Sequence, residues 1–227
     1  MVTRPRDGLG LVLKAIEFAA HKHRDQRRKD PDKTPYINHP IALAQVLREE
    51  GGVRDPVVIA AARLHDTLED TETSYEELRG QFGATIADCV VDVTDVKSLG
   101  KTARKRLQVA KAGRASKAAK QVKLADKICN LRDILASPPA DWSLARQQEY
   151  FDWAKEVVDE VRGANARLER RFDRLYRQRP EGWKEESGAL AIVSAHDRAG
   201  VGRSITTGDL SWMMLNASRC WAPGSIS

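Results

Sequence analysis

The chain has 227 residues, of which 41% are hydrophobic and 31% charged, a composition typical of a folded globular protein and not of a disordered or fibrous one. No run approaches the roughly 20 consecutive apolar residues that a membrane-spanning helix requires, so we expect no membrane partner. The formal charge of +6 is compatible with nucleic acid, with a phosphate-rich small substrate or with an ordinary solvated surface, and it does not decide among them.

The cysteines and the first residues indicate the cellular compartment. Cys89, Cys129 and Cys220 are scattered, and none belongs to a C-x-x-C pair, which argues against a zinc ribbon or a redox dithiol. The opening residues, MVTRPRD, lack the apolar core of a signal peptide. We therefore expect a cytoplasmic protein with reduced thiols.

The first half of the chain has the apolar spacing of helices. Apolar residues three and four apart predict a helix over residues 9–25. A basic loop with two prolines follows, and then a second helix that ends at the glycine pair 51–52. Asp55 and Pro56 form a typical N-cap and first-turn pair, which predicts a third helix over residues 57–67.

The second half continues the helical pattern. Ser74 opens a capping-box sequence and predicts a short helix that ends near Gly83. Further helices are predicted over residues 84–93, 101–112, 116–135 and, after a proline pair, as one long helix from Asp141 to about Tyr176. Because no region alternates as a sheet strand does, we predict an all-α helical bundle over residues 1–179. Residues 180–227 are predicted to be a linker and a poorly ordered C-terminal extension.

Charged and imidazole side chains cluster at the end of the third predicted helix, in the segment LHDTLED over residues 64–70. Adjacent side chains on a helix diverge by about 100°, so His65 and Asp66 can converge on an ion only beyond the helix end. Glu69 and Asp70 follow one turn later, near the same point. The apolar run before them must be buried, and a bound cation would offset the cost of placing unpaired charges at its end.

Two residues elsewhere complete a candidate metal site. His39 precedes a proline at a helix start, and Asp126 stands between two lysines on a later predicted helix. Together with His65 and Asp66 they give two imidazoles and two carboxylates, a set without thiolate that suits one Mn²⁺, or less well Fe²⁺ or Zn²⁺. Each residue also has an ordinary explanation. A histidine before proline commonly packs or caps a helix, and an aspartate flanked by lysines is typical of an exposed surface.

Longer blocks of the sequence resemble the hydrolase domain of the RelA/SpoT family, and most closely its small stand-alone animal form. The resemblance extends over about residues 11–176. The blocks that carry it are RRKD and PYINHP around His39, LHDTLEDT, KRLQV, VKLADK with NLRD, and EYF with WA. Leu68, where valine is familiar, and Cys129, where tyrosine is expected, depart from the pattern.

The resemblance implies an HD-domain helical bundle that uses Mn²⁺ to remove the 3′-pyrophosphate of ppGpp, the alarmone of the stringent response. The animal form is also described as an NADPH phosphatase. Matched position by position, the resemblance implies the metal ligands His39, His65, Asp66 and Asp126, the catalytic pair Glu69 and Asp70, and the nucleotide contacts Arg28, Lys29, Lys101, Asn130 and Tyr150.

Several alternatives fit the same residues. The sequence does not rank ppGpp against NADPH, because both present a phosphorylated ribose beside a purine. An HD hydrolase for another nucleotide, such as a deoxynucleotide, is a second possibility. A catalytically inactive nucleotide-sensing module is a third, although the Glu69–Asp70 pair favours hydrolysis. Nucleic-acid binding has no supporting fold motif, and the sequence predicts no oligomeric state.

Overall fold

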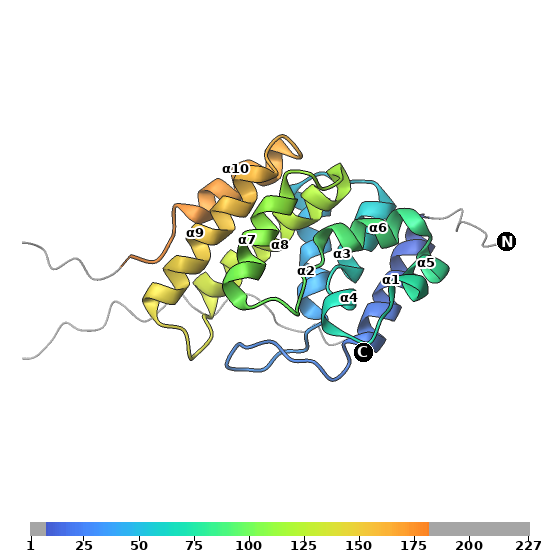
Figure 1. The fold of residues 1–227 in the computed structure, drawn as a ribbon, viewed down its shortest axis with the longest axis horizontal. Coiled ribbons are helices and arrows are strands. Elements are labelled where there is room, and N and C mark those ends of the chain that lie inside the picture. Colours follow the sequence, from blue (N-terminus) through green and yellow to red (C-terminus); the bar gives the residue numbers. More distant parts are fainter. Residues whose placement is uncertain (1–7, 182–227) are drawn as a thin grey trace, which may run out of the picture. The chain divides into compact units, whose positions relative to one another are not determined.

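The computed structural model describes residues 8–181, and over that range the chain is built of helices without extended strands. The elements, in chain order, are α1 Gly8–Lys22, α2 Asn38–Gln45, the π-helical turn η1 Val46–Glu50, α3 Pro56–Leu64, α4 Thr67–Asp70, α5 Tyr75–Phe82, α6 Ala84–Val93, α7 Lys101–Ala112, α8 Lys117–Ala136, α9 Leu144–Glu160 and α10 Ala166–Tyr176 (Figure 1). The predicted all-α class is confirmed. The predicted C-terminal extension lies, from residue 182 onward, outside the described residues.

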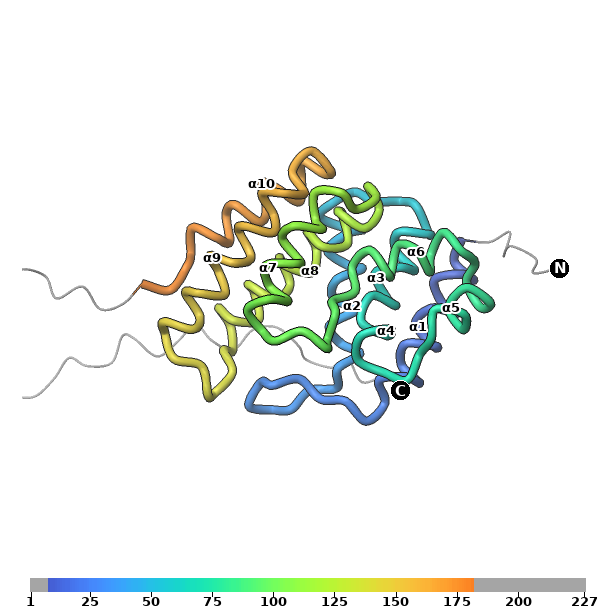
Figure 2. Tube along the Cα trace, in the orientation of Figure 1, coloured from blue at the N-terminus to red at the C-terminus, as the bar shows by residue number. Residues whose placement is uncertain are grey.

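Helices α3 and α8 form the centre of the bundle. Helix α3 packs against α1, α2, α6 and α8, and α8 also contacts α9 and α10, as the trace in Figure 2 shows. The middle of α3 is the alanine run 60–62, which is fully buried and lets neighbouring helices approach closely. Because the end of α3 lies beside the middle of α8, polar side chains at these two places can meet inside the fold.

Side-chain caps begin several helices where the sequence predicts them. The Asp55 carboxylate accepts a hydrogen bond from the Val57 N–H at 2.9 Å, at the start of α3. The Ser74 hydroxyl accepts one from the Glu77 N–H at 3.1 Å, at the start of α5. Each cap satisfies a backbone donor that the helix leaves unpaired, and such a cap stabilises a fold by about 1 kcal/mol.

The predicted single helix from Asp141 to Tyr176 is wrong, because the chain breaks between α9 and α10. Gly163 has φ +86°, a left-handed conformation that glycine adopts without strain. Asn165 then caps α10, with its side-chain oxygen accepting from the N–H groups of Arg167 and Leu168 at 3.0 and 3.2 Å. The break allows α10 to fold back and pack on α8 and α9.

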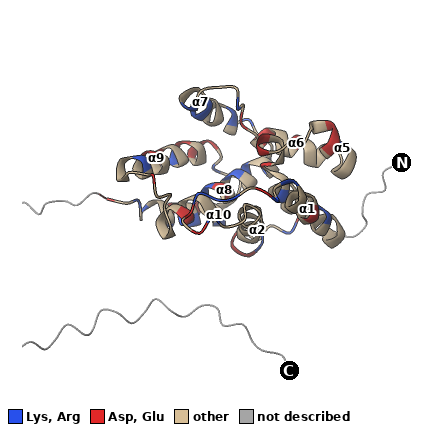
Figure 3. Ribbon diagram, turned by 90° about the horizontal axis from the view of Figure 1, so that it is seen from below, with Lys and Arg blue, Asp and Glu red and all other residues tan. Residues whose placement is uncertain are grey.

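Basic and acidic residues are spread over several helices. Figure 3 shows Lys and Arg positions on α1, α7, α8 and α9. Among the described residues, no helix is both long and apolar enough to cross a membrane.

Candidate metal centre

The His65–Asp66 pair lies at a break between two helices. Helix α3 ends at Leu64 and the short α4 begins at Thr67, so both side chains project beyond the end of the buried helix. The Thr67 hydroxyl donates to the Leu64 carbonyl at 2.7 Å and fixes the turn. Both side chains therefore lie beyond the helix end, where two adjacent residues can face one ion.

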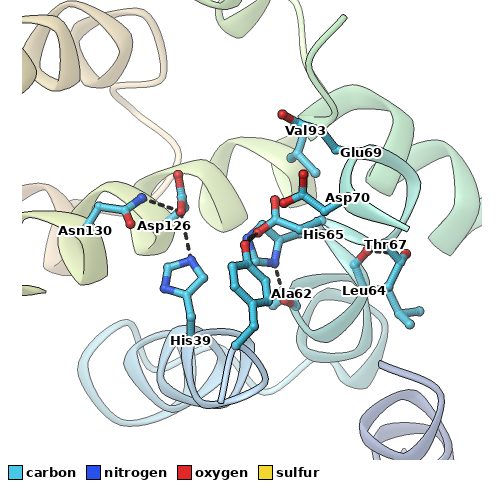
Figure 4. Close-up of polar contacts among 12 residues, drawn as sticks. His39, Ala62, Leu64, His65, Thr67, Glu69, Asp70, Val93, Asp126 and Asn130 are labelled. Atoms are coloured by element: carbon cyan, nitrogen blue, oxygen red, sulfur yellow. Dashed lines mark hydrogen bonds and ion pairs between the residues drawn. The ribbon is translucent and has the colours of Figure 1, made fainter. Parts of the chain in front are cut away.

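Three of the four predicted ligands, from separate elements, converge on one point. His39 of α2 points toward Asp126 of α8, and His65 lies beside them (Figure 4). The His39 Nε2 atom is 3.2 Å from Asp126 Oδ1, and ligand atoms of His39, His65 and Asp126 all lie within 4.8 Å of one another. The fourth, Asp66, borders the group through its Oδ2 atom, which is 2.7 Å from His65 Nε2.

A hydrogen bond of one His65 ring nitrogen leaves the other nitrogen available to a cation. Its Nδ1 donates to the Ala62 carbonyl at 3.0 Å, which leaves Nε2 to face the pocket. The buried Nε2 makes no hydrogen bond, although it lies 2.7 Å from an Asp66 oxygen. Burial alone would lower the pKa of His65, but the charges of Asp66 and Asp126 outweigh burial and raise it. Positive charge is therefore favoured at this nitrogen, and a divalent cation fits there.

The two carboxylates of the group remain ionised. Burial would raise the pKa of Asp66, but the adjacent His65 holds it below its ordinary value. Burial would also raise the pKa of Asp126. The charge of Lys127 and the hydrogen bond from His39 have the larger opposite effect, so the pKa of Asp126 is lowered. Asp126 is held on both sides, with Oδ1 accepting from Asn130 Nδ2 at 2.7 Å and Oδ2 from Lys127 Nζ at 3.1 Å. Charged and oriented carboxylates of this kind are good ligands for a hard divalent ion.

The acidic pair of α4 lies at the edge of the same pocket. Glu69 Oε2 accepts a hydrogen bond from the Asp95 N–H at 3.1 Å, and Asp70 pairs with Lys97. Burial raises the pKa of Glu69 to about 7, and the negative charges of Asp95 and Asp66 add to this effect. A carboxyl group with a pKa near neutrality can accept and return a proton at physiological pH.

The metal pocket, of about 220 Å³, adjoins a wider cleft of about 770 Å³. Four of the predicted nucleotide contacts line this cleft: Arg28, Lys29, Asn130 and Tyr150. The fifth, Lys101, lies instead in an adjoining groove of about 210 Å³, which Glu69 and Tyr150 also line. The described chain therefore places a candidate metal site beside two recesses that carry both basic and acidic side chains.

Comparison with known proteins gives a family. The model of the HD domain matches residues 15–152 of this chain. The chain belongs to the HD-domain family. The resemblance to stand-alone SpoT-like hydrolases is confirmed by individual relatives, which the chain covers almost from end to end.

Two curated relatives are named guanosine-3′,5′-bis(diphosphate) 3′-pyrophosphohydrolase MESH1. The human protein is 53% identical over 168 residues, which are 74% of this chain and 94% of the relative. The Drosophila melanogaster protein is 48% identical over 167 residues, 74% of this chain and 93% of the relative. A solved structure, described as a metazoan ortholog of SpoT that hydrolyses ppGpp, superposes with a TM-score of 0.73 at 46% identity and covers 78% of this chain and 98% of its own.

The HD domain also contains buried charges that the sequence did not reveal. Asp126 is not an exposed residue between two surface lysines, because Lys123 and Lys127 are only 6% and 3% exposed. The Lys127 ammonium also lies 4.1 Å from the centre of the Trp153 ring. The spacing of these lysines, one turn apart and next to an apolar stripe, is the signal that could have identified them. Tyr36, whose hydroxyl donates to Asp66, was likewise missed.

Proposed function

We propose that this HD-domain chain hydrolyses the 3′-pyrophosphate of ppGpp, giving GDP and pyrophosphate, with Mn²⁺ as its metal. The observation that carries the proposal is the convergence of His39, His65 and Asp126 beside a carboxyl group whose pKa is about 7. The name shared by the MESH1 relatives supports the choice of substrate.

The donor atoms fit a divalent ion with mixed nitrogen and oxygen preference, held by His39, His65, Asp66 and Asp126. Such an ion, when bound, supplies Lewis-acid chemistry by withdrawing charge from a phosphate oxygen and lowering the pKa of water. Because these donors include no thiolate, Mn²⁺ is favoured over softer alternatives, and Fe²⁺ or Zn²⁺ is the second choice.

Glu69 acts in this proposal as the general base. Its carboxylate takes a proton from the attacking water while the water oxygen forms a bond to the phosphorus attached to the ribose O3′. The bond between phosphorus and O3′ breaks with its electron pair staying on O3′, and Glu69 gives the proton that it took from water to O3′, which ends as a hydroxyl. Asp70, which pairs with Lys97, lies on the same turn of α4 and helps Glu69 to orient the attacking water.

The cleft accommodates the rest of the nucleotide. Arg28 and Lys29 lie on the loop before α2 and can neutralise phosphate, with the arginine able to make two parallel hydrogen bonds. Asn130 is one turn after Asp126 on α8, within reach of a ribose hydroxyl, and Tyr150 can pack on the sugar or the base. Lys101, in the adjoining groove, can neutralise the phosphate chain.

Parallel assays of the purified chain with Mn²⁺ test this function. We expect turnover of ppGpp with release of pyrophosphate, and we assay NADPH and a deoxynucleoside triphosphate beside it. Orthophosphate from NADPH without ppGpp turnover would reassign the substrate. Turnover of the deoxynucleotide alone would place the chain among other HD phosphohydrolases. Absence of turnover with all three would overturn the proposal.

A further inference from the structure

The loop between α6 and α7, residues 94–100, contacts both members of the acidic pair. The Asp95 N–H donates to Glu69 Oε2 at 3.1 Å, and Lys97 pairs with Asp70. Among the described residues the Glu69 carboxylate accepts no other hydrogen bond, so this single donor from the loop sets its direction. The position of Glu69 therefore depends on what holds the loop.

Helix α7 fixes the start of this loop through Gln108. The Gln108 Nε2 atom donates to both carboxylate oxygens of Asp95, each at 2.7 Å. Gln108 is 7% exposed, and its amide orientation follows from its partner, because an ionised carboxylate only accepts hydrogen bonds. A buried contact at this distance leaves the Asp95 backbone little freedom to move.

Helix α8 holds the last residue of α6, from which the loop starts. The Lys123 ammonium donates to the Val93 carbonyl at 3.0 Å, directly before the loop begins. Gln108 and Lys123 both line the metal pocket together with Glu69 and Asp95. The loop is thus held by α7 at Asp95, and the residue before it by α8 at Val93, both within two residues of the contact with Glu69.

We propose that Asp95 and Gln108 are positioning residues for the Glu69 carboxylate. Gln108 holds the Asp95 carboxylate, and the Asp95 backbone in turn directs Glu69 Oε2, so that the other oxygen, Oε1, is left to accept a proton in the pocket. This inference rests on the proposed function, because it takes Glu69 to be the general base.

The variant Gln108→Met removes both hydrogen bonds to Asp95 and keeps a side chain of similar length. We expect kcat for ppGpp to fall about 10- to 100-fold, the loss that a small misplacement of a reacting group causes. We expect KM and the Mn²⁺ dissociation constant, measured by titration calorimetry, to stay as in the unaltered chain. Gln121→Met is the matched control, since its amide donates to the Ala164 carbonyl in another part of the bundle.

A charge swap distinguishes positioning from a general loss of stability. Gln108→Glu alone sets two carboxylates against each other and lowers kcat, whereas Gln108→Glu combined with Asp95→Asn rebuilds the pair with donor and acceptor exchanged. We expect the double variant to regain most of the lost kcat. This comparison remains informative even if Gln108→Met does not fold.

The proposal is overturned if Gln108→Met turns over ppGpp as fast as Gln121→Met. It is also overturned if the loss appears in KM or Mn²⁺ affinity, or if the double variant is as slow as Gln108→Glu alone. Glu69→Gln, assayed in parallel, shows whether such a result contradicts only the positioning role or also the proposed function. Full activity of Glu69→Gln would remove Glu69 from the mechanism altogether, whereas an inactive Glu69→Gln beside a fully active Gln108→Met would refute only the positioning role.

Discussion

The metal pocket and the wide cleft share a wall, but their side chains are held in different ways. In the pocket, His39 and His65 are 5% exposed, and Asp126 has hydrogen-bond partners on both oxygens. In the cleft, Arg28 pairs with Asp133 and Lys97 lines the same wall, and the side chains of Asp133 and Lys97 are each 51% exposed. The pocket is therefore arranged before substrate arrives, whereas the cleft can adjust around it. Changes in the pocket should affect kcat most, and changes in the cleft should affect KM.

The largest effect is expected for Asp126→Asn. Removal of this charge takes away a proposed ligand and leaves Lys127 without its carboxylate partner. Because ligands of one ion act as a unit, we expect kcat/KM to fall on the order of 10³-fold or more, together with Mn²⁺ binding measured by calorimetry. Asp88→Asn is the control, since Asp88 accepts a hydrogen bond from the exposed Tyr75 hydroxyl outside the pocket. Tight Mn²⁺ binding by Asp126→Asn would contradict the assigned ligand set.

The next effect concerns Glu69 and pH. Its pKa is raised to about 7 by burial, so the carboxyl group is protonated below that pH and ionised above it. A general base must be ionised, and we therefore expect kcat/KM for ppGpp to rise as the pH increases through about 7. Glu69→Gln should lower kcat by about 10²- to 10⁴-fold and abolish this rise. A rise with the same midpoint in Glu69→Gln would assign the titration to another group.

A smaller effect is expected in the cleft. Lys29→Ala removes a cation that lines the cleft and not the metal pocket, and we expect KM for ppGpp to increase about tenfold, the usual loss for one hydrogen bond to a charged group, with little change in kcat. Arg162→Ala is the matched control, because Arg162 pairs with Asp159 and Asp173 on the surface. If Lys29→Ala lowered kcat and left KM unchanged, the distinction between pocket and cleft would be wrong.

The smallest effect is expected in the scaffold. Asp55→Ala removes the cap of α3, and we expect the free energy of unfolding to fall by about 1 kcal/mol in chemical denaturation. Because α3 stays packed on four other helices, the His65 geometry and kcat should not change. Loss of Mn²⁺ binding by Asp55→Ala would show that the pocket depends on the helix start more than its contacts indicate.

Much of the fold could be predicted because its signals are local. The capping residues Asp55 and Ser74 begin helices where the sequence places them, and the glycine pair at 51–52 ends one. The break between α9 and α10 was missed because the helical pattern continues on both sides of it. Only Gly163 and Asn165 mark the break, and each is also tolerated within a helix at modest cost.

The site was predictable only in part. Residues named from the HD motif and the resemblance lie around one pocket and its recesses, since short motifs fix their own local geometry. Asp95, Gln108 and Lys123 could not be found in this way, because their roles arise only when α6, α7 and α8 pack together. An acidic residue in a loop and a glutamine on a basic helix are ordinary until the fold brings them within hydrogen-bond distance.

Phosphorus NMR of ppGpp with the full chain tests the central claim most directly. The protein is first treated with a chelator and then incubated with and without added Mn²⁺. Excess chelator is added to both samples before the spectra are recorded, because paramagnetic Mn²⁺ broadens phosphorus resonances. We predict resonances of pyrophosphate and GDP with Mn²⁺ and unchanged ppGpp without it. Hydrolysis at the same rate in the sample without added Mn²⁺ would contradict the metal centre, and release of orthophosphate in place of pyrophosphate would contradict the proposed reaction.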